Sequence, residues 1–169
     1  NDELISDAFY QNLEFGTAGL RGVIGAGTNR MNIYTVGQAS QGLAAYVNSV
    51  TPNGKIAIAY DSRIKSDVFA RAAAAIFAAN GIKVYIYKEL MPTPMLSFAV
   101  RELGCGCGIV ISASHNSGEY NGVKCYGPDG CQMTDEPAAV VTEKIQSIPY
   151  FVPEKKSYQA YLNEGIIAY

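Results

Sequence analysis

Apolar residues recur along this chain in two rhythms, one typical of helices and one typical of buried strands. Across residues 34–49 they return every three or four positions, and the stripe of Val36, Leu43 and Val47 predicts a helix with one buried face. The segment Lys55–Tyr60 is apolar after its first residue and too short for a helix, so it predicts a buried strand. Between them, TPNG at 51–54 predicts a turn.

The rest of the chain continues this alternation. Ser66 and Thr134 are placed to cap the starts of helices, and Gly81 and Gly104 are placed to end them. Further helices are predicted at 67–80, 94–103, 135–145 and 158–165, and further strands at 82–88, 107–114 and 122–127. An apolar stub, 166–169, follows the last helix, and we expect the natural protein to continue beyond it.

Strands and helices in alternation predict an α/β layered fold. We expect a mixed, largely parallel sheet of about four strands flanked by helices. In open sheets of this kind, ligands bind outside the carboxyl ends of the strands. Two polar clusters, 61–63 and 112–116, follow predicted strands and therefore mark the expected binding edge.

Composition and charge narrow the function classes. The 169 residues are 49% hydrophobic and 17% charged, with a net charge of −2. This charge indicates neither nucleic-acid binding nor a polybasic membrane anchor. The apolar runs are too short for a membrane helix, and the acidic start of the chain is unlike a signal peptide. The four cysteines have no usual zinc spacing, so we expect free thiols, with Cys107 in the core.

Candidate chemistry lies in the segment 110–128. Ser112, Ser114 and the only histidine, His115, fall within four residues at the end of a predicted strand. A serine hydrolase is disfavoured, because no G-x-S-x-G motif surrounds either serine and neighbouring side chains in an extended segment point to opposite faces. Phosphoryl transfer through a serine needs positioning and positive charge more than a strong base. An ordinary polar loop without chemistry is the alternative that the spacing alone leaves open.

Cations and glycines for such a transfer are also present. Lys124 follows the serine loop, and Arg21 lies in the segment 14–32, which contains five glycines and two arginines. No strand is predicted before these glycines, so they do not form a dinucleotide fingerprint. Thr17 and Arg21 could instead lie against an anionic group, and the alternative is a plain surface hairpin.

Together these stretches resemble the N-terminal domain of the α-D-phosphohexomutase superfamily, the phosphoglucomutases and phosphomannomutases. FGTAGLRG at 15–22 is similar to the opening motif of that family, and SASHNSGEYNGVK at 112–124 to its phosphoserine loop. AYDSR at 59–63 and MPTP at 91–94 also match. Ser117 stands where many members have proline, which would restrict the residue before it, so we expect a more flexible loop here.

The resemblance implies a role for each matching residue. Ser114 corresponds to the phosphoserine that donates and recovers the phosphoryl group, and its phosphate is expected to ligate Mg²⁺. His115 is expected to orient or polarise the reacting hydroxyl, and Lys124 to take part in acid–base chemistry. Arg21 is expected to lie beside the phosphoserine.

The resemblance also implies the reaction. Thr17 and Asn116 are expected to support phosphate or substrate binding. Hexose 1-phosphate and hexose 6-phosphate would interconvert through a bisphosphorylated sugar, with Mg²⁺ and a glucose 1,6-bisphosphate-type activator. The alternatives are the same chemistry on glucosamine or pentose phosphates, or a catalytically silent domain that binds phosphosugars.

Family members are longer than this chain. We therefore expect residues 1–150 to be the catalytic-serine domain and residues 151–169 to connect it to a second domain. The partners expected are a hexose phosphate substrate and the remaining domains of the same chain, not nucleic acid or membrane. Most Mg²⁺ ligands would lie in those domains, so the isolated chain is expected to be inactive. The expected location is the cytoplasm.

Overall fold

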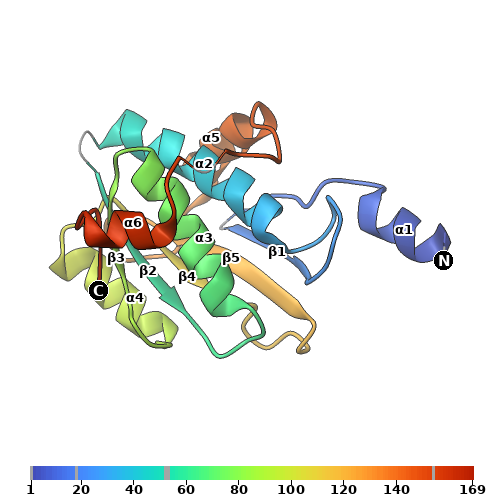
Figure 1. Cartoon of the computed structure of the whole chain (residues 1–169), viewed down its shortest axis with the longest axis horizontal. Coiled ribbons are helices and arrows are strands. Elements are labelled where there is room, and N and C mark those ends of the chain that lie inside the picture. The colour runs from blue at the N-terminus through green and yellow to red at the C-terminus, as the bar shows by residue number, and fades with distance from the viewer. Residues whose placement is uncertain (1, 18, 52–53, 154) are drawn as a thin grey trace.

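The computed structural model describes residues 2–17, 19–51, 54–153 and 155–169, and it alternates helices and strands throughout (Figure 1). In chain order the elements are α1 (Asp2–Phe9), β1 (Gly19–Val23), α2 (Ile33–Val50), β2 (Lys55–Tyr60), α3 (Ser66–Ala79), β3 (Lys83–Ile86), α4 (Thr93–Glu102), β4 (Cys107–Ile111), β5 (Tyr120–Tyr126), α5 (Asp135–Gln146), α6 (Tyr158–Asn163) and β6 (Ile167–Ala168). No helix of the described residues is long and apolar enough to cross a membrane.

The strands form one mixed sheet. Within the described residues it has six strands in the order β1-β5-β4-β2-β3-β6. β2 pairs in parallel with β3 and β4, and β3 with β6, whereas β5 runs antiparallel to β1 and β4. The predicted α/β class and the mixed, largely parallel sheet are confirmed, but the sheet has two strands more than predicted.

Both additional strands depend on tertiary pairing. β1 reads GLRGV, and its two glycines and one arginine give no strand pattern until the segment pairs with β5. β6 is only two residues long and lies in the apolar stub, where it adds to the edge of the sheet beside β3. The segment predicted to be a connection therefore contributes β6 to this sheet and α6 to the helices that pack against it.

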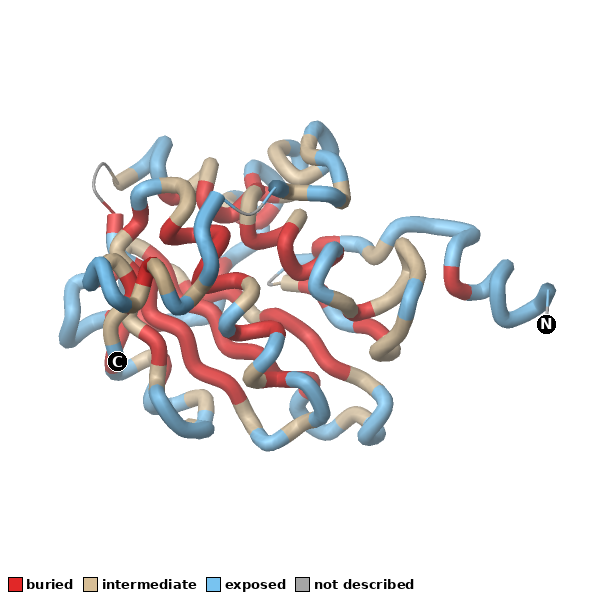
Figure 2. Tube along the Cα trace, viewed as in Figure 1, coloured by how far each residue is buried: buried red, intermediate tan, exposed pale blue. Residues whose placement is uncertain are grey.

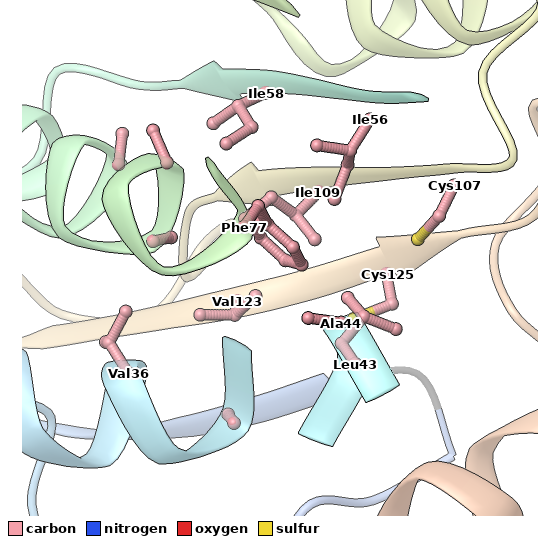
Figure 3. Packing of buried hydrophobic residues seen from close by; sticks show 14 of the residues in the cluster. Val36, Leu43, Ala44, Ile56, Ile58, Phe77, Cys107, Ile109, Val123 and Cys125 are labelled. Atoms are coloured by element: carbon pink, nitrogen blue, oxygen red, sulfur yellow. The ribbon is translucent and has the colours of Figure 1, made fainter. Parts of the chain in front are cut away.

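Helices cover the sheet on both faces, giving three layers. Side chains of α2, α3, α5 and α6 pack in one core with Ile56 and Ile58 of β2, and Figure 3 shows Leu43 and Phe77 among them. The alternate residues of β2, Ala57 and Ala59, face a second cluster with side chains of α4. In Figure 2 the buried residues follow the central strands, while the loops at the strand ends are exposed. This arrangement leaves the loops free to carry a site.

Several predicted ends are displaced in the structure. Lys65 is the N-cap of α3 with a φ of +62°, and Ser66 is the first helical residue, so the prediction that Ser66 caps this helix was wrong. Thr134 does stand at the N-cap of α5, but its side chain makes no capping hydrogen bond. β4 ends at Ile111 rather than at residue 114, because Ser114 adopts a φ of +56°, which a strand does not contain.

The four cysteines are free thiols, and Cys107 lies in the core as predicted. Burial raises the pKa of Cys105 to about 11 and that of Cys107 to about 12. Both thiols therefore stay protonated near neutral pH and act as small apolar side chains.

Candidate active site

The loop after β4 presents one serine and buries another. Ser112 is buried, and its Oγ accepts a hydrogen bond from the backbone N–H of the exposed Ser114 at 3.0 Å. The N–H of Asn116 donates to the carbonyl of Ala113 at 3.1 Å and closes a tight turn. Ser114 has a left-handed φ of +56°, a conformation that non-glycine residues hold only where their surroundings enforce it. The turn thus displays the Ser114 side chain at the carboxyl end of a parallel strand.

The antiparallel pair of β1 and β5 brings two cations to one face. In the register of this pair, Arg21 lies opposite Gly122 and Gly19 lies opposite Lys124. Arg21 and Lys124 are therefore diagonal neighbours, a relation that places side chains on the same face with Cα atoms about 7–8 Å apart. Two positive charges on one face suit an anion such as a phosphate group.

A small pocket is lined by half of the predicted site residues. It has a volume of about 210 Å³ and lies at the β1–β5 edge of the sheet. Its lining includes Thr17, Arg21, Ser112, Lys124 and Gln132. Three of the predicted site residues, Thr17, Arg21 and Lys124, therefore meet here in space, although they come from two separate stretches of sequence. Gln132 belonged to no motif, so nothing in the sequence indicated it.

The remaining predicted residues, Ser114, His115 and Asn116, lie in the serine loop and do not line this pocket. Arg21 Nη1 donates to the Asn116 side-chain oxygen at 2.8 Å, which ties β1 to the serine loop across 95 residues of sequence. His115 is exposed in the same loop, next to Ser114 in the chain. The structure brings the predicted residues to one edge of the sheet, and their individual roles remain predictions.

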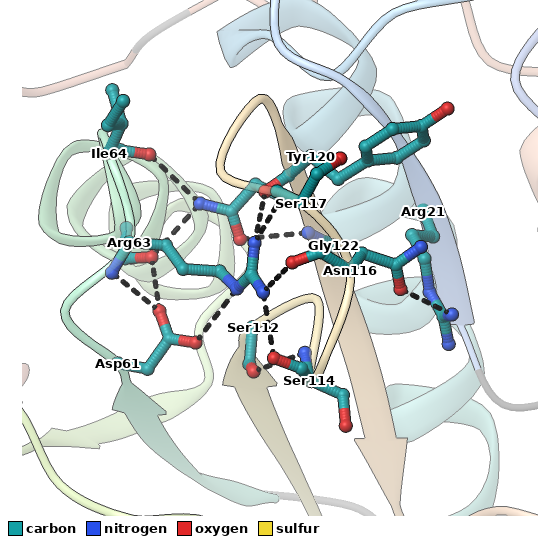
Figure 4. A network of polar contacts seen from close by, with 12 residues as sticks. Arg21, Asp61, Arg63, Ile64, Ser112, Ser114, Asn116, Ser117, Tyr120 and Gly122 are labelled. Carbon is teal, nitrogen blue, oxygen red and sulfur yellow. Dashed lines mark hydrogen bonds and ion pairs between the residues drawn. The ribbon is translucent and has the colours of Figure 1, made fainter.

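Sequence reasoning did not identify the arginine that organises the loop. Arg63, in the polar cluster after β2, donates hydrogen bonds to backbone carbonyls of the serine loop (Figure 4). The sequence signals were its position in DSR, directly after a buried strand, and the match of AYDSR to the family. Which partner it would find could not be read from that position, because the partners lie more than 50 residues further along.

The described side chains do not make a magnesium site by themselves. Among the described residues, no three His, Cys, Asp or Glu side chains gather closely enough to hold a metal ion. Mg²⁺ is usually held by one or two carboxylates together with phosphate oxygens and water. No chemical step is therefore assigned to the ion below.

The fold and the loop define a class: a three-layer α/β/α domain that displays a serine beside two cations. The chain matches the family model described as phosphoglucomutase/phosphomannomutase, alpha/beta/alpha domain I, over residues 12–150. The chain therefore belongs to the phosphoglucomutase/phosphomannomutase family, and the resemblance noted from its motifs is confirmed.

Individual relatives agree with this membership. The chain is 43% identical to a phosphoglucomutase of Staphylococcus aureus (strain bovine RF122 / ET3-1) over 142 residues, which are 84% of this chain and 26% of that protein. A Thermus thermophilus protein assigned to the phosphomannomutases superimposes with a TM-score of 0.78 at 31% identity, covering 87% of this chain and 32% of that one.

A more distant structure shows the same fold. The open form of parafusin, a phosphoglucomutase from Paramecium, superimposes with a TM-score of 0.72 at 18% identity over 92% of this chain and 30% of its own. The chain thus spans about a quarter of the length of the curated relatives it matches.

Proposed function

We propose that this chain is the phosphoserine domain of a phosphohexomutase, with Ser114 as the phosphoryl carrier. The observation that carries the proposal is the placement of Ser114. Its backbone is held in a left-handed turn at the end of β4, next to the face that bears Arg21 and Lys124. Phosphoryl transfer depends mainly on positioning and on neutralising charge at the transferring group, and this edge of the sheet offers both.

The proposed step is a displacement at phosphorus. A hydroxyl oxygen of the bound sugar phosphate forms a bond to the phosphorus on Ser114, and the bond from phosphorus to Ser114 Oγ breaks. The hydroxyl proton leaves the sugar, and Ser114 Oγ ends as a neutral hydroxyl, so protons and charge balance. Lys124 is proposed to carry this proton, His115 to orient the hydroxyl, and Arg21 to neutralise the phosphate. The reverse step on the reoriented bisphosphorylated sugar restores the phosphoserine.

Other parts of the proposal extend beyond the chain. Mg²⁺ would supply charge neutralisation when bound, with a phosphate oxygen on Ser114 as one ligand and most of the others from further domains. A glucose 1,6-bisphosphate-type activator would load the serine. We propose residues 1–150 as the catalytic-serine domain, with residues 151–169 leading to a second domain. The free thiols are consistent with a cytoplasmic location.

The substrate class is proposed from the family, not from a sugar-binding pocket in this chain. Hexose 1-phosphate and hexose 6-phosphate are the proposed pair, because the relatives are named phosphoglucomutase and phosphomannomutase. Thr17 and Asn116 are proposed to support the phosphate end of the substrate, since Thr17 lines the pocket and Asn116 contacts Arg21.

The test compares serine variants of the full-length protein. We expect Ser114→Ala to lower turnover of glucose 1-phosphate by at least about 10³-fold, as expected when a covalent carrier is lost. Ser117→Ala is the matched control from the same loop and should keep most of the activity. Steady-state kinetics with Mg²⁺ and a bisphosphate activator would measure both variants. Near-normal turnover of Ser114→Ala would refute the proposal.

A further inference from the structure

One arginine binds the serine loop from the opposite side to the two cations. Arg63 lies in the segment between β2 and α3, and only 14% of its side chain is exposed. Figure 4 shows its guanidinium reaching into the loop, whereas the Ser114 side chain points away from it. Arg63 therefore contacts the backbone of the candidate carrier but not its hydroxyl.

The Arg63 guanidinium donates hydrogen bonds to four backbone carbonyls of the loop. Nη1 donates to the carbonyls of Ser117 at 2.8 Å and Tyr120 at 3.0 Å. Nη2 donates to the carbonyl of Ser114 at 2.7 Å and also to that of Asn116. A guanidinium is a rigid, planar fork, so four acceptors that share it must keep fixed positions relative to one another. The curvature of the whole loop is thereby set by one side chain.

Arg63 is itself held in place. The Oδ1 atom of Asp61 accepts the backbone N–H of Arg63 at 3.0 Å and the Ser66 hydroxyl at 2.8 Å, and its Oδ2 lies 3.6 Å from Arg63 Nε. The buried Asn121 amide donates to the carbonyl of Ile64 at 3.0 Å and to Ser66 Oγ at 2.9 Å. The start of β5 is thus bonded to the segment that carries Arg63, which leaves this arginine little freedom to move.

The backbone of Ser114 is fixed on both sides by these contacts. Its N–H donates to Ser112 Oγ at 3.0 Å, and its carbonyl accepts from Arg63 at 2.7 Å. A left-handed serine is unfavourable and persists only where surrounding interactions enforce it. These two hydrogen bonds fix the peptide groups on either side of the Ser114 Cα atom. They therefore hold the unfavourable φ of Ser114 in place.

We propose that Arg63 is a positioning residue for phosphoryl transfer, which it serves by holding Ser114 in its left-handed conformation. This inference rests on the proposed function of Ser114. Asp61 acts indirectly, because it holds Arg63 in place. Because Arg63 does not reach the pocket that Arg21 and Lys124 line, it should affect the rate of transfer and leave substrate binding nearly unchanged.

The experiment uses full-length protein with Arg63→Lys, which keeps the charge but cannot present a planar fork to four carbonyls. Arg71→Lys is the matched control, since Arg71 is an exposed arginine on α3 that pairs weakly with Asp67 at 3.9 Å. Misplacing a reacting group by about 1 Å can cost about 10²-fold in rate, so we expect kcat of Arg63→Lys to fall by about 10- to 100-fold. KM should stay within about twofold, because ground-state binding is untouched.

A second readout does not depend on activity. Hydrogen exchange of the amides in residues 113–120 should speed up in Arg63→Lys and stay unchanged in Arg71→Lys. If Arg63→Lys does not fold, Asp61→Asn takes its place, with a smaller loss of kcat and the same local change in exchange.

The outcomes separate this inference from the proposed function. Wild-type kcat and unchanged loop exchange in folded Arg63→Lys would overturn the positioning role while leaving the function of Ser114 intact. A loss of kcat accompanied by an equal rise in KM would also overturn it, since that pattern indicates a binding role. If the wild-type protein had no mutase turnover, the proposed function would fail, and faster loop exchange in Arg63→Lys would then show only a structural role.

Discussion

Lys124 illustrates how one residue can be placed for chemistry by the strand around it. Its neighbours Val123 and Cys125 are buried on the core face of β5, while Lys124 itself is half-buried on the opposite face. On that face it shares a pocket with Arg21. The strand thus places alternate residues in the core and in the site. A substitution at Lys124 should therefore lower activity without lowering stability.

We predict that Lys124→Met in the full-length protein lowers kcat by at least about 10²-fold, the range expected for lost acid–base catalysis. Its melting temperature should change little, because the flanking core residues are untouched. Lys55→Met is the control, since Lys55 begins β2 at the far end of the sheet and contacts only the carbonyl of Leu103 among the side-chain hydrogen bonds of the described residues. Near-wild-type kcat for Lys124→Met would remove this lysine from the mechanism.

At the scale of elements, the close approach of β1 to β5 depends on glycine. Gly19 has a φ of +140°, and a Cβ at this position would overlap the carbonyl oxygen of Val123. No side chain fits there without separating the strands, and the strands carry Arg21 and Lys124. By contrast, a Cβ on Gly37 of α2 would meet no heavy atom within 4 Å outside its own helix and neighbours.

We predict opposite effects for alanine at these two glycines. Gly19→Ala should destabilise the protein by at least about 2 kcal/mol, from backbone strain and overpacking together. Gly37→Ala should stabilise it by about 0.5–1 kcal/mol, because glycine inside a helix costs about that much relative to alanine. Denaturant unfolding of the two variants would measure both changes. Equal effects would show that β1 does not approach β5 as described.

The elements that the sequence predicted well are those with local periodicity. The strand Lys55–Tyr60 has the predicted bounds, and the helix predicted at 34–49 spans Ile33–Val50. Elements that depend on distant partners were missed, as β1 and β6 show. The same holds for the site. The SASHN loop could be identified from the sequence, whereas the contact between Arg63 and this loop joins residues more than 50 positions apart and could not be predicted without the fold.

At the scale of the whole molecule, this chain corresponds to one part of its longer relatives. It spans about a quarter of the length of its S. aureus relative, and its described residues gather no set of metal ligands. What it does contain is a serine held in a strained turn, two cations on the neighbouring face and an arginine behind the loop. We propose that this combination serves a serine that carries phosphate and passes it on.

The most direct measurement is the location of phosphate on the full-length protein isolated from cells. Peptide mass spectrometry should find phosphate on Ser114 in part of the population. Adding glucose 1-phosphate in excess should lower that fraction as the bisphosphorylated sugar forms. Phosphate on Ser112 or Ser117 with none on Ser114, or a Ser114 phosphate that no sugar phosphate removes, would contradict the account.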